Sequence, residues 1–320
     1  MASQLTFDSL DEVQRWALRE VLVAGREAAP RGVPTRELRA ISFALRHPRR
    51  RCITNSSRRW SLPLAIGEFC WHVSGSNELP FIEYYAPRWR EFSTDRRTID
   101  GSCYGKKMFG DTPDGFSPWS QLVELLRLDP DTRRAVLSFY DVSMALRADA
   151  RDVACALTLQ FLARDGSLDA IAYMRSNDAI WGLPYDVFLF TMLQELLACE
   201  LGLALGLYFH VTGSLHLYGR HFKLAERILE DKSEFYFEMP PMQAHLEVPL
   251  FLRLESALRV FGGVAEEELQ AVQPYWRDLL GVLHWYRWSK AEGGPAIEAI
   301  LGDSPYGALI AGLSEAASRR

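Results

Sequence analysis

The stretch CALTLQFLARDGSLDAIAYMRSNDAIWGLPYD, residues 155–186, decides the fold. Two apolar segments, Ala154–Ala163 and Leu168–Met174, have strand character. They are separated by the tetrapeptide RDGS at 164–167, whose Asp-Gly pair is a hairpin signal. A long apolar helix is expected soon afterwards, over 184–204. The stretch therefore predicts an antiparallel pair of strands followed by a buried helix.

The rest of the chain mixes helices and strands without regular alternation. Helices are expected over 8–27, 61–74 and 117–128, and further strands over Ala135–Tyr140 and Leu207–His216. This arrangement favours an α+β fold in which helices pack on one mixed sheet.

The remaining segments have weaker patterns. Residues 30–58 mix short strand-like pieces with loops, and residues 76–115 have the aromatic and glycine clusters of a site-forming loop region. From about Val248 onward the pattern is helical again, for example over Glu266–Leu283. We expect a single domain over 1–320, with a core at about 28–235 and a helical C-terminal segment at about 245–320.

The composition excludes some functions. The chain has 320 residues, of which 48% are hydrophobic and 24% charged, as in a soluble globular protein. Its formal net charge of −5 provides no positive field for nucleic acid, so no such partner is expected. Arginines still cluster locally, as in RHPRRR at 46–51, and such a cluster can hold a small anionic substrate.

The cysteines argue against disulfides and structural zinc. None forms a C-x-x-C pair or a zinc-finger spacing with histidine, so we expect no metal and a cytoplasmic location. The N-terminal stretch lacks signal-peptide features, and no apolar run reaches the ~18 residues of a membrane span. The cysteines are Cys52, Cys70, Cys103, Cys155 and Cys199.

One cysteine has a candidate for an activating cation. A cysteine in an apolar strand, such as Cys155, is usually a small buried hydrophobe. Reactivity requires a lowered pKa from nearby positive charge, and Arg175 at the end of the next strand can supply it. The segment after Arg175 reads equally as a capped connection to a helix or as an anion site.

Six short motifs follow one another along residues 28–230. They are Glu68 with Trp71 in a helix, GSCYG at 101–105, DPDTRR at 129–134, Cys155 with Gln160-Phe161, RSND with GLPYD between 175 and 186, and HLY at 216–218 with His221. In this order and spacing they resemble the motifs of the thymidylate synthase family, and in particular its pyrimidine nucleotide hydroxymethylases.

The resemblance implies covalent catalysis on a pyrimidine nucleotide. Cys155 would add to C6 of the base, so that C5 becomes a carbon nucleophile. Glu68, Tyr104 and Asp178 would order water and move protons. The residues expected to bind the nucleotide are Arg31, Arg133, Arg134, Gln160, Arg175, Ser176, Asp186, His216 and Tyr218.

The resemblance also implies a one-carbon donor and a partner subunit. The donor would be 5,10-methylenetetrahydrofolate, held by Arg58, Asp178 and Gly182. Arg58 stands where the family has lysine, which keeps the charge but changes the geometry. The family is an obligate homodimer whose interface is the sheet, so Arg133 and Arg134 would reach the nucleotide phosphate of the partner's site.

Asp186 decides the expected base. Members of the family that use dUMP have asparagine here, whose amide can donate to O4 and accept from N3–H. A carboxylate accepts from the N4 amino group of cytosine, and a proton shared with N3 satisfies the second position. The alternative is an aspartate with only a helix-dipole role. We expect a cytosine nucleotide, CMP or dCMP, and a 5-hydroxymethyl product.

Further departures from the family pattern bear on the same choice. Ala156 replaces a histidine of the water network at O4 of uracil, and Ala86 replaces the first tryptophan of a Trp-x-x-Trp motif if Trp89 is the second. A smaller residue there would open the reaction intermediate to water, which favours hydroxymethylation over methylation. Arg133 and Ser176 match members of the family that use deoxynucleotides. The short apolar tail that closes the family's folate site has no equivalent here.

Three alternatives stay open. The chain could be a methylating synthase acting on dUMP, against which Asp186 argues. It could be a hydrolase that uses Cys155 and His216. It could also be a non-catalytic nucleotide-binding protein.

Overall fold

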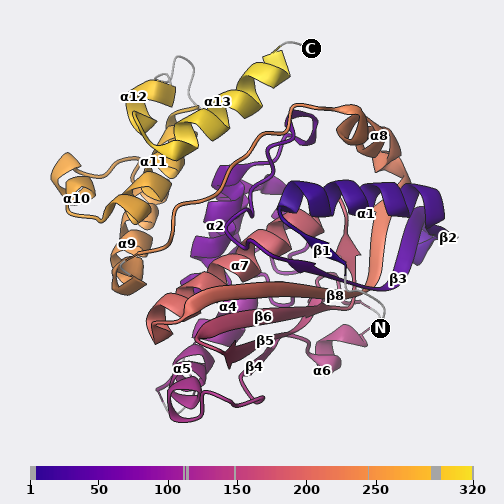
Figure 1. Cartoon of the computed structure of the whole chain (residues 1–320), viewed down its shortest axis with the longest axis horizontal. Coiled ribbons are helices and arrows are strands. Elements are labelled where there is room, and N and C mark those ends of the chain that lie inside the picture. The colour runs from indigo at the N-terminus through magenta and orange to yellow at the C-terminus, as the bar shows by residue number, and fades with distance from the viewer. Residues whose placement is uncertain are drawn as a thin grey trace.

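The structure is a computed structural model that describes residues 5–110, 112, 115–147, 149–243, 245–289 and 297–318. Its strands form one mixed sheet in the order β1-β3-β8-β6-β5-β4, with β2 beside β3 and β7 beside β8 (Figure 1). β6 and β8 run parallel, whereas β3 with β8 and β5 with β6 are antiparallel. The strands are β1 (Thr6–Phe7), β2 (Arg26–Ala28), β3 (Thr35–Leu45), β4 (Val136–Ser138), β5 (Ala156–Arg164), β6 (Ser167–Met174), β7 (Asn177–Asp178) and β8 (Ala204–Tyr218).

Helices pack on this sheet, so the expected α+β class is confirmed. The helices are α1 (Leu10–Ala24), α2 (Leu62–Val73), α3 (Leu79–Tyr85), α4 (Tyr104–Phe109), α5 (Pro118–Leu128), α6 (Val142–Ala145), α7 (Gly182–Leu201), α8 (Phe222–Glu230), α9 (Val248–Val260), α10 (Glu266–Gln270), α11 (Pro274–Ser289), α12 (Ile297–Leu301) and α13 (Pro305–Ser318). Short 3₁₀ turns include η1 (Pro30–Gly32), η2 (Ser56–Arg58) and η3 (Pro87–Glu91).

The hairpin predicted between β5 and β6 is confirmed. Asp165 and Gly166 occupy the turn with φ of 49° and 74°, the left-handed region that a two-residue turn of this kind requires. Arg164 then pairs with Ser167, which fixes the register of the two strands. This register brings the start of β5, next to Cys155, beside the end of β6, next to Arg175.

Helix α7 is the centre of the core. It is apolar on all sides and almost entirely buried, as expected for a helix enclosed by protein. It contacts β6 and β8 on one side and α2 on the other. It ends at Gly202, whose φ of 68° is accessible to glycine without strain. The first turn of α7 therefore lies at a fixed place beside the ends of β6 and β7.

Four segments differ from expectation. The helix expected over 8–27 ends at Ala24, because Arg26–Ala28 pairs with β3 as the strand β2. Residues 30–58 contain an eleven-residue strand, β3, in which Ala40 has a φ of 56° and disturbs the regular alternation that signals a strand. The helix expected over 266–283 is divided, because Pro274 lacks an N–H group and begins a new helix, α11. The region 76–115 contains α3 and α4 as well as loops.

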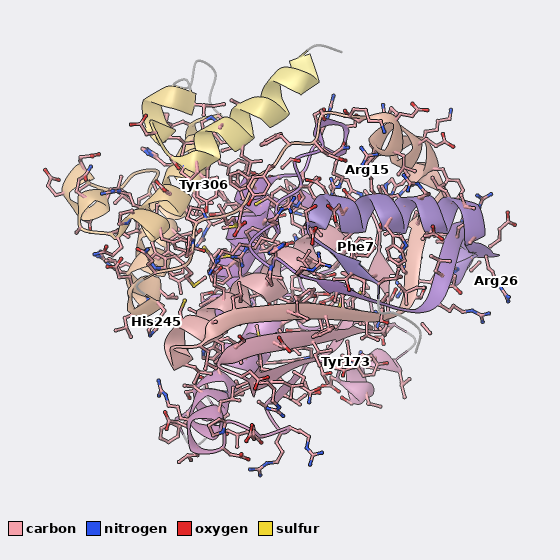
Figure 2. All side chains as sticks on the ribbon, in the orientation of Figure 1. Phe7, Arg15, Arg26, Tyr173, His245 and Tyr306 are labelled. Atoms are coloured by element: carbon pink, nitrogen blue, oxygen red, sulfur yellow. The ribbon has the colours of Figure 1, made fainter. Side chains whose placement is uncertain are left out.

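The C-terminal helices α9–α13 gather beside α2, far from the β2–β3 hairpin (Figure 1). α11 packs on α2, and α13 packs on η2. Tyr306 of α13 is completely buried in this packing (Figure 2). Within the described part of the chain, no helix combines the length and the apolar character needed to cross a membrane.

Candidate active site

Cys155 lies at the end of the segment that leads into β5. The guanidinium of Arg175 lies beside it. Nη2 of Arg175 lies 3.8 Å from Cys155 Sγ. The same guanidinium donates from Nε to the carbonyl of Ala154 at 2.8 Å and from Nη2 to that of Val153 at 2.9 Å. The backbone N–H of Arg175 also donates to the carbonyl of Cys155 at 2.9 Å. The arginine therefore holds both the thiol and the backbone that carries it.

The groups around Cys155 have opposite effects on the pKa of its thiol. Burial raises the pKa of the thiol to about 11, the positive charge of Arg175 lowers it, and the carboxylates of Asp186, Asp152 and Asp178 raise it further. The thiol is thus protonated at neutral pH in the absence of ligand. Formation of the nucleophilic thiolate needs either additional positive charge or a base.

Tyr104 and His72 form a stacked pair next to the cysteine. The Tyr104 hydroxyl accepts a hydrogen bond from the N–H of Ala156 at 3.2 Å. Its ring lies parallel to that of His72, with centroids 5.3 Å apart. His72 Nδ1 in turn accepts from the N–H of Gly105 at 3.1 Å, and burial lowers the pKa of His72 to about 3. Tyr104 is therefore fixed with its hydroxyl at the residue after Cys155.

Two carboxyl groups share the interior of the site. Asp186 stands in the second turn of α7 and accepts a 2.7 Å hydrogen bond from Asn177 Nδ2. Burial raises the pKa of Asp186 to about 7, and the neighbouring Asp178 contributes in the same direction. Glu68 on α2 has a pKa raised to about 8 by burial and then by Asp186, while a hydrogen bond from Trp89 lowers it. Both groups can therefore exchange protons near neutral pH.

The Asn177–Asp186 bond argues against a mere helix-dipole role for Asp186. A carboxylate that acts as a cap accepts from backbone N–H groups of the first turn. Asp186 instead contacts a side chain, and Gly182 packs against that contact. A methyl group at Gly182 would lie 3.0 Å from Asn177 Nδ2 and 3.4 Å from Asp186 Oδ2. Glycine at this position leaves room for the bond.

The residues expected at the folate meet on another side of the site. Asp178 accepts from the N–H of Ile180 at 2.8 Å, and Arg58 Nη2 donates to the carbonyl of Ile180 at 2.6 Å. The guanidinium of Arg58 lies 4.6 Å from the ring of Trp181, which is 36% exposed. Burial lowers the pKa of Arg58. An accessible aromatic ring backed by a cation fits a flat heteroaromatic ligand with an acidic tail.

A second group lies toward the surface. Ser176 Oγ is 3.4 Å from His216 Nδ1, and the rings of His216 and Tyr218 meet edge to face at 5.0 Å. The pKa of Tyr218 is raised by burial and by Asp178, and lowered by Arg220 and Arg31. Arg31 is exposed in η1 with a φ of 53°. Hydroxyl, imidazole and guanidinium groups thus gather where a phosphosugar could bind.

Gln160, Arg133 and Arg134 lie outside this group. Gln160 is five residues beyond Cys155, which in a strand corresponds to roughly 16 Å. Its Nε2 donates to the carbonyl of Arg133 at 3.1 Å. Both arginines are exposed. Within one chain these three residues are not beside Cys155.

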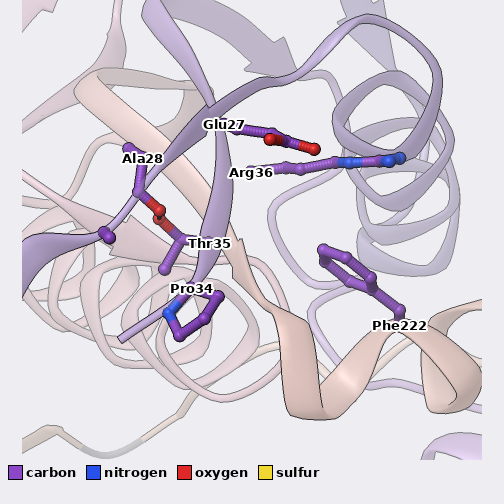
Figure 3. A pocket seen from close by; sticks show the side chains of 7 residues that line it. Glu27, Ala28, Pro34, Thr35, Arg36 and Phe222 are labelled. Atoms are coloured by element: carbon purple, nitrogen blue, oxygen red, sulfur yellow. Dashed lines mark hydrogen bonds between the residues drawn. The ribbon is translucent and has the colours of Figure 1, made fainter. Parts of the chain in front are cut away.

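A shallow hollow of about 430 Å³ lies between the β2–β3 hairpin and the start of α8 (Figure 3). It contains none of the residues around Cys155. Arg36 covers the ring of Phe222 at 5.2 Å within it. The lining is Glu27, Ala28, Ala29, Pro34, Thr35, Arg36 and Phe222.

Comparison with known proteins agrees with this arrangement. Residues 16–249 match the family model described as thymidylate synthase. The chain belongs to the thymidylate synthase family. A relative from Bacillus phage SP01, named deoxyuridylate hydroxymethyltransferase, is 31% identical over 229 residues, which are 68% of this chain and 59% of the relative. The chain thus spans less than two thirds of that relative's length.

The part of the chain beyond the thymidylate synthase match contains most of α9 and all of α10–α13. Tyr85 of α3 donates to Glu255 of α9 at 2.7 Å, and Arg259 donates to the same carboxylate at 2.7 Å. Tyr85 also lies directly against Gly67, next to Glu68. The C-terminal helices therefore support α2 directly through α11, and through the contact of α9 with Tyr85 of α3.

Several residues of the site were not predicted from the sequence, among them Trp181 and His72. Asn177 occupies a variable position of the family's Arg-Ser-x-Asp motif, and Tyr208 and His210 look like ordinary members of a strand. A histidine and a tyrosine at inward positions of β8 were the available signal, because buried polar side chains need partners. In the structure these residues form hydrogen bonds that lead to Asp186. No group of three histidine, cysteine or acidic residues in the described ranges could hold a metal ion.

Proposed function

We propose that this chain transfers a one-carbon unit from 5,10-methylenetetrahydrofolate to C5 of a cytosine nucleotide, CMP or dCMP, and that water completes a hydroxymethyl group. The supporting observation is Asp186, whose pKa is raised to about 7 by burial. A carboxyl group that is partly protonated at neutral pH can accept from the N4 amino group and donate to N3. This is the pattern that cytosine requires.

The chain's own residues account for the steps. Cys155 forms a bond to C6, and Arg175 stabilises its thiolate. Protonation at N3 by Asp186 draws charge from the ring and eases this addition. After C5 has gained the new carbon and lost its proton, the bond from that carbon to the folate nitrogen would break and release tetrahydrofolate. Water then adds its oxygen to the carbon, and the bond between sulfur and C6 breaks to return the Cys155 thiolate. Glu68, whose pKa is about 8, can take the proton from this water in its ionised form.

Arg58, Asp178 and Trp181 would hold the folate. The exposed ring of Trp181 offers a stacking surface, and the guanidinium of Arg58 lies against it. The folate supplies the carbon unit when it is bound. These residues orient it beside Asp186 and Glu68.

A homodimer would complete the phosphate site. One face of the sheet carries part-exposed apolar side chains in adjacent strands, with Ile171 opposite Phe209 and Tyr173 opposite Val211. Tyr173 lies on the side of the sheet away from α1 (Figure 2). Burial of this face against a second copy is favourable. The exposed Arg133 and Arg134 would then reach the partner's nucleotide. The free cysteines agree with a cytoplasmic enzyme.

A second candidate is hydroxymethylation of a uracil nucleotide. The name of the phage relative favours it. A neutral carboxyl at Asp186 could also donate to O4 and accept from N3–H. Methylation of dUMP is a third outcome.

The hydrolase alternative has little support in the geometry. Among the described residues, His216 contacts Ser176 and the carbonyl of Ser214, and no hydrogen bond joins an imidazole to Cys155. A cysteine hydrolase needs its base within reach of the thiol.

Product analysis tests the proposal. The protein is incubated with methylenetetrahydrofolate and CMP, dCMP, UMP or dUMP, and the products are weighed by mass spectrometry. Gain of CH2O on a cytosine nucleotide supports the proposal, and gain on uracil supports the second candidate. Gain of CH2 on dUMP with formation of dihydrofolate identifies a methylating synthase. Absence of product with all four nucleotides contradicts all three.

A further inference from the structure

A line of hydrogen bonds leads from Asp186 into the sheet. Tyr208 Oη lies 2.8 Å from His210 Nδ1, and His210 Nε2 lies 3.0 Å from Asn177 Oδ1. Asn177 Nδ2 then donates to Asp186 Oδ2 at 2.7 Å. Tyr208 and His210 are 0% exposed and Asn177 is 1% exposed. Water therefore does not compete for these contacts.

The chemistry of the groups fixes the direction of every bond. An amide nitrogen only donates, so Asp186 Oδ2 accepts. Asn177 Oδ1 must then accept from His210, which requires the neutral tautomer with the proton on Nε2. His210 Nδ1 is left as an acceptor, and the hydroxyl of Tyr208 donates to it. Burial keeps His210 neutral by lowering its pKa to about 3.

The packing around the line keeps this arrangement in place. The ring of Phe43 stacks on His210, with centroids 5.0 Å apart and planes 15° apart. A side chain at position 182 would collide with the Asn177 amide, and glycine avoids this contact. The other ionisable groups that influence Asp186 or are influenced by it are Glu68, Tyr104, Cys155, Asp178 and Tyr208. Of these, Tyr208 belongs to the line itself.

We propose that Tyr208 and His210 are positioning residues which, through Asn177, place the proton of Asp186 on Oδ1 and so decide which base the site accepts. Oδ2 is always an acceptor because the amide of Asn177 donates to it. Oδ1 is therefore the oxygen that donates to the base, and it favours cytosine when it faces N3 and uracil when it faces O4. This inference rests on the proposed function, since it assigns the recognition of the base to Asp186. Without His210 the side-chain amide of Asn177 could rotate, and the proton of Asp186 could then lie on either Oδ1 or Oδ2.

The tautomer of His210 can be measured without turnover. The protein has seven histidines, and comparison of ¹⁵N-histidine NMR spectra of the native protein and a His210→Gln variant identifies the ring of His210. We expect a neutral ring with its proton on Nε2 throughout pH 5.5–8.5. A ring that is protonated on Nδ1, or that titrates in this range, overturns the inference. This result is independent of whether the protein acts on any nucleotide.

Kinetics then test the effect on base selection. His210→Leu removes the donor to Asn177, whereas His210→Gln keeps an N–H at a similar place. We expect the ratio of kcat/KM for cytosine over uracil nucleotides to fall about tenfold in the leucine variant, the loss expected for one hydrogen bond, and to be largely kept in the glutamine variant. The acidic limb of the pH profile should move upward in the leucine variant, because the bond from Asn177 lowers the pKa of Asp186.

Two further variants keep the kinetic test decisive. If His210→Leu does not fold, Tyr208→Phe removes the other end of the line and should lower the same ratio severalfold. Tyr275→Phe is the control, since its hydroxyl is also buried but contacts the sulfur of Met192. Equal ratios in native, Tyr208→Phe and Tyr275→Phe proteins overturn the inference. A native protein inactive on all nucleotides contradicts the proposed function, while the NMR result still decides the tautomer.

Discussion

Replacement of Asp186 by asparagine should stabilise the protein at high pH and have no such effect at low pH. The carboxyl group has a pKa raised from 3.8 to about 7 by burial. Between these values the folded state holds a proton that the unfolded state has released. The contribution of Asp186 to the free energy of unfolding therefore falls as pH rises from about 4 to 7 and does not change further above that range. Asparagine does not ionise, so the variant lacks this loss.

The magnitude follows from the two pKa values. One pKa unit corresponds to about 1.4 kcal/mol, so the pH-dependent loss is about 4 kcal/mol. The amide oxygen of the new asparagine can still accept from Asn177, so the packing of α7 is retained. Asp186 also raises the pKa of Glu68, and removal of its charge relieves that group too. Both effects favour the variant at high pH.

Urea unfolding at pH 4.5, 6, 7 and 8.5, at one protein concentration, measures this difference. The free energy of unfolding of Asp186→Asn relative to the native protein should rise across the series by several kcal/mol. Asp131→Asn is the control, because the side chain of Asp131 is 93% exposed. A difference between Asp186→Asn and native protein that is independent of pH would refute the assignment of a protonated carboxyl.

Three other perturbations have expected outcomes. Arg175→Met should slow alkylation of Cys155 by iodoacetamide about tenfold at pH 8, because the positive charge of Arg175, which lowers the pKa of the thiol, is removed; unchanged labelling would contradict this role. Glu195→Gln should cost about 3–5 kcal/mol in urea unfolding, since the buried Arg51 loses its partner; a cost below 1 kcal/mol would contradict the pairing. Inactive Arg133→Ala and Cys155→Ser proteins should regain activity when mixed if sites are shared between subunits, and failure to do so would contradict shared sites.

The sequence predicted the parts of the fold that depend on local signals. The Asp165-Gly166 turn, the apolar run of α7 and the boundaries of α2 and α5 follow from turn chemistry and periodicity. The eleven residues of β3 did not, because Ala40 adopts a left-handed conformation that interrupts the regular alternation, while residues on both sides of it pair with β8. The break before α11 could have been predicted from Pro274, because proline lacks an N–H group and cannot continue a helix.

Some residues of the candidate site could be predicted from the sequence and others could not. Cys155, Arg175 and Asp186 were predicted from ordered motifs, and the structure brings their charges within interaction range. Asn177 and His210 were not predicted, since they lie 33 residues apart and nothing local indicates that they pair. Contacts of this kind are set by the register of β7 and β8, which a single sequence does not specify.

The raised pKa values of Asp186 and Glu68 mean that the site needs support from well-packed elements. Two partly buried carboxyl groups that repel each other destabilise the folded protein at neutral pH. Such a pair persists only if the surrounding structure holds it. Asp186 stands on α7, which is almost entirely buried, and Glu68 stands on α2, against which α3 and α11 pack. Tyr85 of α3 bonds to Glu255 of α9. The C-terminal helices beyond the family match therefore contribute to the chemistry indirectly, because they resist the displacement of α2 that would separate the two carboxyl groups.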